Sequence, residues 1–270
     1  MNEDAYRIEE DLCLFVVADG MGGHRGGQTA SAMAVELLPK YYRQMLKAVE
    51  GSLTQDAIIE ALGRSIAAVS REIFEAGKQK GRLHRMGTTL VTLLLARGHA
   101  FISHLGDSRA YILRDGDLHR LTEDHSFVNG LVQLGMLEPE ESEQHPAKNL
   151  LTIYAGMKHD LQPDVAVLRL RLGDRFLLCS DGVWGMIPHE RIQRALNENQ
   201  TSIAACRRLI TRANANGGED NLTAMIIGYG DAPARTDRPP KTSVRLKIVT
   251  TNLDLPTPPV SAEDGDVAGD

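Results

Sequence analysis

The sequence predicts an α+β fold in which a pair of long amphipathic helices accompanies antiparallel strands. Apolar residues recur at three- and four-residue spacing over residues 26–50 and again over 55–76, as on the buried face of a helix. From residue 87 onward, short β-branched and apolar runs alternate with Gly-Asp or Asp-Gly pairs, which is typical of strands joined by tight turns. Apolar residues make up 42% of the 270-residue chain, enough to bury a sizeable core.

The N-terminal segment is expected to form a pair of strands. Residues 5–8 and 12–18 are strand-like, and an acidic turn separates them. If these strands pair, Glu3 and Asp4 come close to Asp19. The two amphipathic helices follow, and we expect them to pack side by side.

The middle of the chain predicts one antiparallel meander. Its strands are expected over residues 88–96, 99–105, 109–113 and 118–121. Asp115-Gly116 has the composition of a hairpin turn. Asp107, in contrast, follows Gly106 between two strong strands, which makes it a candidate functional residue.

The second half of the chain alternates polar and apolar segments. Residues 122–147 are polar and predict a surface flap, in which His125 and His145 are expected to be solvated or capping, with metal ligation as the alternative. Strands and helices are then expected over 164–170, 175–179, 187–196, 202–215 and 222–227. These elements complete a domain over residues 1–230. Residues 231–270 are rich in Pro, Asp and small residues, so we expect a mostly disordered tail despite a strand-like run at 244–249.

Charge and cysteine content argue against several classes of protein. The net charge is −6 and no long Lys/Arg block occurs, so nucleic acid is not an expected partner. No apolar run approaches the ~18 residues of a membrane helix. The cysteines are widely spaced in apolar contexts at Cys13, Cys179 and Cys206, which predicts buried free thiols and a reducing, cytoplasmic compartment.

One stretch suggests a cation site. Asp19 follows an apolar strand-like run and precedes a glycine cluster that begins at Gly20. Glycines let the backbone approach a ligand closely, and a carboxylate beside free carbonyls is how proteins bind Mg²⁺ or Mn²⁺. Asp181-Gly182 repeats this arrangement after another apolar run. Asp-Gly is also a common turn dipeptide, so each pair alone is equally explained by a tight turn that binds no cation.

The acids at strand ends together predict a shared metal site. They are Asp19, Asp107, Asp181 and Asp220. Strand ends at one edge of a sheet bring such residues together, and buried carboxylates repel one another unless a cation neutralises them. Two metal ions ~3.5–4 Å apart activate water for phosphoryl transfer without a protein nucleophile. The sequence has neither a nucleophile elbow nor a P-loop.

The order of the motifs resembles that of the metal-dependent Ser/Thr protein phosphatases, the PPM or type 2C family, in their bacterial form. The matching blocks are Asn2-Glu3-Asp4, Val17 to His24, Gly87-Thr88-Thr89, Gly106-Asp107-Ser108-Arg109, Ser180 to Trp184 and Gly218-Glu219-Asp220-Asn221. They span about residues 2 to 228. The resemblance implies an αββα sandwich, with two central antiparallel sheets flanked by helix pairs.

The resemblance also implies a role for each matched residue. The implied metal ligands are Glu3, Asp19, Gly20, Asp107, Asp181 and Asp220, and the implied catalytic residues are Asp4, Asp19, Asp181 and Asp220. By this resemblance, Asp19 is expected to bridge both Mn²⁺ or Mg²⁺ ions, and the Gly20 carbonyl to bind the first. Asp181 and Asp220 are expected to bind the second, which Glu3 would reach directly or through water with Asp4 in support. Asp107 corresponds to the acid that helps to bind a weaker third ion in family members.

Three departures from the family pattern stand out. Family members carry an Arg four residues before the Glu of the first motif, whereas this sequence begins two residues before Glu3 and lacks that Arg and the first strand. Either the start is placed too late or phosphate binding is weakened. Gly185 stands where the family has an Asp, which bears on the third ion. Met21 replaces a His of eukaryotic relatives, so water is expected to protonate the leaving group.

The function expected is hydrolysis of phosphoserine and phosphothreonine in proteins by in-line attack of a metal-activated water. Phosphorylated proteins, including a cognate Ser/Thr kinase, are the expected partners. The alternative from another class is a non-catalytic regulatory module of the same fold, which the missing Arg and Gly185 favour and the retained acids oppose. A dedicated phosphatase for an anti-sigma-factor antagonist is a further alternative.

Overall fold

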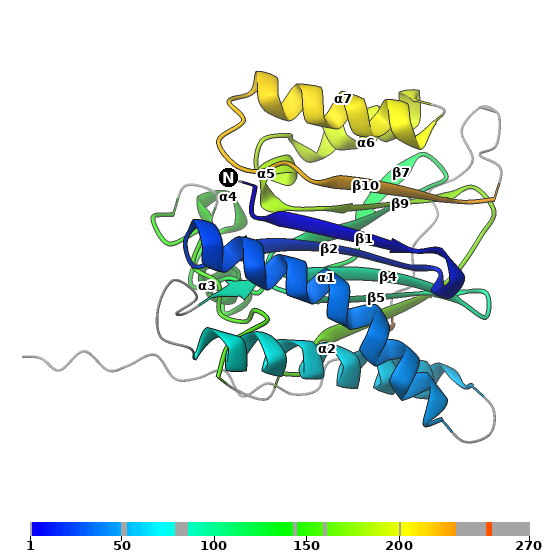
Figure 1. Ribbon diagram of the computed structural model, residues 1–270. Helices are drawn as coiled ribbons and strands as arrows, with labels where there is room; N and C mark the ends of the chain where they lie inside the picture. The colour runs from blue at the N-terminus through cyan, green and yellow to red at the C-terminus, as the bar shows by residue number, and fades with distance from the viewer. Residues whose placement is uncertain are drawn as a thin grey trace, which may run out of the picture.

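Two antiparallel sheets lie face to face between two layers of helices in the computed structural model (Figure 1). The structure describes residues 2–49, 53–78, 86–142, 145–158, 161–199, 201–230 and 247–249. This arrangement confirms the predicted αββα sandwich.

The first sheet has the strand order β1-β2-β4-β5-β8-β11, and β3 pairs with the end of β2. Its strands are β1 (Asp4–Glu9), β2 (Leu14–Met21), β3 (Gly87–Thr88), β4 (Leu90–Ala96), β5 (His99–Leu105), β8 (Asp164–Arg169) and β11 (Lys247–Val249). The second sheet has the order β10-β9-β6-β7. Its strands are β6 (Arg109–Arg114), β7 (Asp117–Arg120), β9 (Asp174–Cys179) and β10 (Ala224–Tyr229).

The helices cover the outer faces of the sheets. A short 3-10 turn, η1 (Glu10–Leu12), joins the first two strands, and α1 (His24–Lys47) and α2 (Gln55–Gly77) lie together over the first sheet (Figure 1). The second sheet carries α5 (Asp181–Trp184), α6 (His189–Glu198) and α7 (Ser202–Ala215). The flap contributes α3 (Phe127–Gln133) and α4 (Pro139–Ser142).

Three apolar layers follow from this stacking. One contains Leu38 and Ile66 of the helix pair and Val16 of β2. A second fills the space between the sheets with residues such as Val91 and Phe176. A third lies under α6 and α7. Because each sheet is covered on both faces, its central strands are apolar on both faces.

The prediction of a single meander is wrong, although its strands are placed correctly. β4 and β5 pair in the first sheet, whereas β6 and β7 pair in the second. The chain crosses between the sheets at the turn that contains Gly106, whose φ is 91°. Strands buried on both faces lack the polar alternation that would assign them to one sheet, so the sequence pattern does not reveal the crossing.

The predicted buried thiols are only partly confirmed. Cys179 is buried and Cys206 is half-buried, but Cys13 is exposed, and all three are free. Cys13 lies in a left-handed turn with φ 49° between η1 and β2, where its side chain leaves the core.

The described part of the chain contains no helix long and apolar enough to cross a membrane. Of the predicted tail, only the residues of β11 are described, and the rest lies outside the described residues. The domain boundary at residue 230 therefore stays a prediction.

A buried ion pair within the second sheet also contacts the first sheet through its arginine. Arg114 on β6 binds Asp174 on β9 through two bonds of 2.7 and 2.6 Å, and the same guanidinium donates to the carbonyl of Arg169 on β8 at 2.9 Å. The two side chains are 6% and 1% exposed. Loss of one partner would leave the other charge buried and unpaired.

Asp174→Ala is therefore expected to lower the free energy of unfolding by about 3–5 kcal/mol in urea titrations. Glu60→Gln, which removes the exposed Glu60–Arg64 pair on α2, is the control and should leave the midpoint unchanged. Equal effects of the two substitutions would contradict this role of the buried pair.

Candidate active site and metal centre

The first part of the candidate site is the end of β2 beside the start of β1. Asp4 and Asp19 are directly paired in the β1–β2 ladder, so the predicted approach of the N-terminal acids to Asp19 is confirmed. The carbonyl of Glu3 accepts a hydrogen bond from the Gly20 amide at 3.2 Å. The strand pairing thus brings Glu3, Asp4, Asp19 and Gly20 to one place.

Two threonines fix the backbone of Asp19. The Thr89 hydroxyl accepts from the Asp19 amide at 3.0 Å, and the Thr88 hydroxyl donates to the Asp19 carbonyl at 2.8 Å. The Thr89 amide donates to the same carbonyl at 2.8 Å. The Gly87-Thr88-Thr89 motif, which carries no chemistry of its own, therefore positions the central acid.

Gly20 is required because another segment crosses very close to it. A Cβ atom at this position would lie 2.1 Å from the carbonyl oxygen of Gly27, in the first turns of α1, and 2.8 Å from that of Glu3. Space explains this glycine, since its φ is not positive.

The second sheet contributes Asp181 at the start of α5, directly after β9. The preceding Ser180 hydroxyl donates to Asp4 Oδ2 at 2.8 Å and accepts from the Thr223 amide at 3.1 Å. The Glu3 amide donates to Asn221 Oδ1 at 2.6 Å. Ser180 and Asn221 therefore join the acids of the two sheets, a role that we did not predict although both residues lie inside recognised motifs.

The carboxyl groups gathered here interact strongly. Burial, followed by the charges of Asp181 and Asp4, raises the pKa of Asp19 to about 10. Burial also raises the pKa of Asp4 and of Asp181, and the nearby charge of Asp220 raises both further. Asp220 itself is exposed and marks the open side of the cluster.

The cluster has the properties of a cation site. Asp4 Oδ1 and Asp181 Oδ1 are buried without a hydrogen-bond partner. Among the described residues, no Lys or Arg forms an ion pair with Asp4, Asp19 or Asp181. Buried carboxylates without a counter-charge are unstable as anions, and oxygen donors are the ligands that Mg²⁺ and Mn²⁺ prefer. The residues present therefore fit divalent cations.

Asp107 lies at the edge of this cluster, in the turn between the sheets. It is 8% exposed, and burial followed by the charge of Asp181 raises its pKa to about 7. The Trp184 indole donates to the Asp107 carbonyl at 2.9 Å. Gly185, which ends α5, offers no carboxylate, so the weaker third ion stays a prediction.

Comparisons with known proteins agree with this geometry. The family model for protein phosphatase 2C matches residues 1–226. The chain belongs to the protein phosphatase 2C family. It is 36% identical over 229 residues to the serine/threonine phosphatase stp of Listeria monocytogenes, which covers 84% of this chain and 89% of that protein.

Solved structures support the same membership. The S. agalactiae serine/threonine phosphatase superposes with a TM-score of 0.76 at 35% identity, covering 85% of this chain and 94% of that one. The catalytic domain of the phosphatase PstP, in complex with two manganese ions, gives a TM-score of 0.69 at 33% identity, covering 84% and 90%. This phosphatase 2C member is a metal-dependent protein phosphatase, as its motifs predicted.

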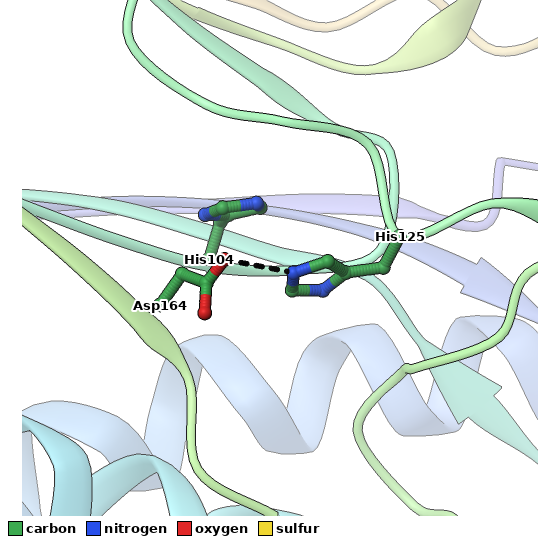
Figure 2. A group of neighbouring side chains, drawn as sticks. All are labelled: His104, His125 and Asp164. Atoms are coloured by element: carbon green, nitrogen blue, oxygen red, sulfur yellow. Dashed lines mark hydrogen bonds and ion pairs between the residues drawn. The ribbon is translucent and has the colours of Figure 1, made fainter. Parts of the chain in front are cut away.

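The predicted flap histidines have different environments. His145 Nδ1 accepts from the Ala147 amide at 3.1 Å, which agrees with a capping role. His125 is instead half-buried and lies with His104 and Asp164 in a group of potential ligands outside the acid cluster (Figure 2). The expectation that His125 is solvated is wrong, because its side chain is 10% exposed and its ring packs against the ring of His104.

The pKa of Asp19 makes stability depend on pH when divalent cations are removed. With this pKa raised to about 10, the folded protein keeps a proton on Asp19 between pH 7 and 8.5. An unfolded Asp, with a pKa of about 3.9, has lost its proton in this range, so rising pH favours unfolding.

In EDTA, the free energy of unfolding is expected to fall by about 1.4 kcal/mol per pH unit over this window because of Asp19. Asp19→Asn should remove that slope, whereas Asp56→Asn, on the exposed face of α2, should retain it. Parallel pH curves for the wild type and Asp19→Asn in urea titrations would refute the assignment.

Proposed function

We propose that Asp19, Asp181 and Asp220, with the Gly20 carbonyl and Glu3, hold two divalent cations with which the protein hydrolyses phosphoserine and phosphothreonine. The observation that carries this proposal is the burial of mutually repelling carboxyls with unpartnered oxygens at the junction of two sheets. Two Mn²⁺ or Mg²⁺ ions there would supply the charge that neutralises phosphoryl oxygens and would lower the pKa of a water nucleophile.

The protein's own residues keep this site in place before any substrate arrives. Thr88 and Thr89 hold the Asp19 backbone, so its carboxyl points from a rigid strand end. The Ser180 hydroxyl occupies one oxygen of Asp4 and leaves the other for the cluster. Such fixed carboxyls need little reorganisation during the reaction, which is the basis of electrostatic catalysis.

The open side of the site indicates how a substrate enters. Asp220 is exposed, whereas Asp4, Asp19 and Asp181 are at least half-buried, so a phosphorylated side chain approaches past Asp220. A side chain projecting from a protein or peptide can reach such a surface-open site. We therefore infer phosphoproteins as substrates. We also propose that a cognate Ser/Thr kinase is among them and, from the three free cysteines, that the compartment is the reducing cytoplasm.

The non-catalytic alternative explains the site less well. A module that only binds a partner has no use for several buried carboxyls whose pKa values are raised by burial and by neighbouring carboxyl charges. The relatives to which this chain is similar are serine/threonine phosphatases, and one of them is in complex with two manganese ions.

Hydrolysis of p-nitrophenyl phosphate and of a phosphothreonine peptide tests the proposal. Phosphate release is expected with Mn²⁺ and should stop in excess EDTA. Asp181→Asn should lower the rate by about 100-fold, since it removes a metal-binding charge. Asp117→Asn, on β7 away from the cluster, is the matched control. Manganese binding without turnover would contradict the catalytic function and support the binding module.

A further inference from the structure

A second group of polar side chains lies beside the turn that carries Asp107. His104 is the next-to-last residue of β5, Asp164 begins β8, and His125 comes from the segment between β7 and α3; Figure 2 shows the three facing one another. One potential ligand atom from each of the three lies within 4.8 Å of the other two. His104 is 4% exposed, and the group is not part of the acid cluster.

The bonding within this group does not suit a metal ion. The two rings are stacked, with centroids 4.5 Å apart and planes inclined by 21°, so their in-plane lone pairs lie in two nearly parallel planes and do not meet at one ion. His104 Nε2 lies 2.6 Å from the Glu123 carbonyl, which can only accept, so this nitrogen carries the hydrogen.

Both ring nitrogens of His125 are already engaged. Nδ1 accepts from the Gly106 amide at 3.3 Å, so the hydrogen is on Nε2, which donates to Asp164 Oδ2 at 3.3 Å. This bond lowers the pKa of the Asp164 carboxyl and keeps it ionised as an acceptor. Burial lowers the pKa of His104 to about 4, so a neutral ring packs against His125.

His125 contacts both backbone groups of Gly106. Its own amide donates to the Gly106 carbonyl at 3.0 Å, while its ring accepts from the Gly106 amide. Gly106 has φ 91°, and a Cβ there would lie 2.7 Å from Thr89 Cγ2, so no side chain of its own can anchor this residue. The turn into Asp107 must therefore be held by its neighbours.

We propose that His125, oriented by Asp164 and packed on His104, is a positioning residue that fixes the Gly106–Asp107 turn and so holds Asp107 at the edge of the metal cluster. This inference rests on the proposed function of the acid cluster. Among the described residues, His125 forms no hydrogen bond to the cluster's carboxyls, and it acts through the backbone of Gly106.

A double-mutant cycle measured by Mn²⁺ binding tests this role without requiring turnover. His125→Gln is expected to weaken the Mn²⁺ binding step that depends on Asp107 by about tenfold, as for other residues that orient metal ligands. In an Asp107→Asn background the same substitution should have no further effect, because the carboxylate that His125 positions is absent. His99→Gln, at the opposite end of β5, is the matched control in both backgrounds.

Substitutions at Asp164 provide an independent test that leaves His125 unchanged. Asp164→Ala should weaken the same binding step, whereas Asp164→Asn keeps an acceptor oxygen for His125 and should restore most of the affinity. This pair also carries the test if His125→Gln fails to give a cooperative thermal transition. If His125 only stabilised the fold, Asp164→Asn would not restore Mn²⁺ affinity, and the effect of His125→Gln would not depend on Asp107.

Several outcomes would overturn the positioning role. Equal effects of His125→Gln with and without Asp107 would show that it acts elsewhere, and unchanged Mn²⁺ binding would show that it does not act on the cluster. One equivalent of Zn²⁺ bound by the wild type and lost in His104→Gln would make the three side chains a metal site instead. If the Mn²⁺ cycle holds but the wild type releases no phosphate, the positioning role stands and the proposed function fails.

Discussion

Several aspartate side chains lie close together where the two sheets meet, and the packing of the rest of the structure has to keep them there. Asp4, Asp19 and Asp181 are half-buried. Beyond burial, the charges of Asp181 and Asp4 raise the pKa of Asp19, and the charge of Asp4 also raises the pKa of Asp181. Carboxyls in such a position favour separation of the segments that carry them unless a cation is bound. The packing of the sandwich supplies the opposing free energy, because three apolar layers hold the sheets and helices in register.

Polar contacts of the backbone then fix the acids individually. Thr88 and Thr89 hold Asp19, while Ser180 and Asn221 connect the N-terminal acids to the second sheet. The hydroxyl of Thr89 also meets that of Ser108 at 2.6 Å, which links the Asp19 strand to the Asp107 turn. The site is thus built from strand ends of both sheets, and neither sheet alone would form it.

Close backbone approach explains the glycines of this site better than turn formation does. Gly20 and Gly182 lie against carbonyl oxygens of Gly27 and Asn221, each only 2.1 Å from where a Cβ would be. In contrast, Gly106 needs its positive φ as well as the space beside Thr89. The same Asp-Gly or Gly-Asp pattern in the sequence therefore serves two different physical purposes.

The sequence by itself determined the helix pair, the strands and the identity of the acids, because period and strand-end position are local properties. It also determined the family, since the motifs occur in one order along the chain. It did not reveal that β5 and β6 belong to different sheets, or that Cys13 is exposed.

Only the tertiary structure decided which polar residues support the acids. Ser180 and Asp4 are 176 positions apart, and Glu3 and Asn221 are 218 apart, so no local pattern could pair them. His125 illustrates the same limit, because its neighbours Gly106 and Asp164 come from distant segments. The sequence determines the chemical type of each side chain, but the packing of the two sheets determines which groups it contacts.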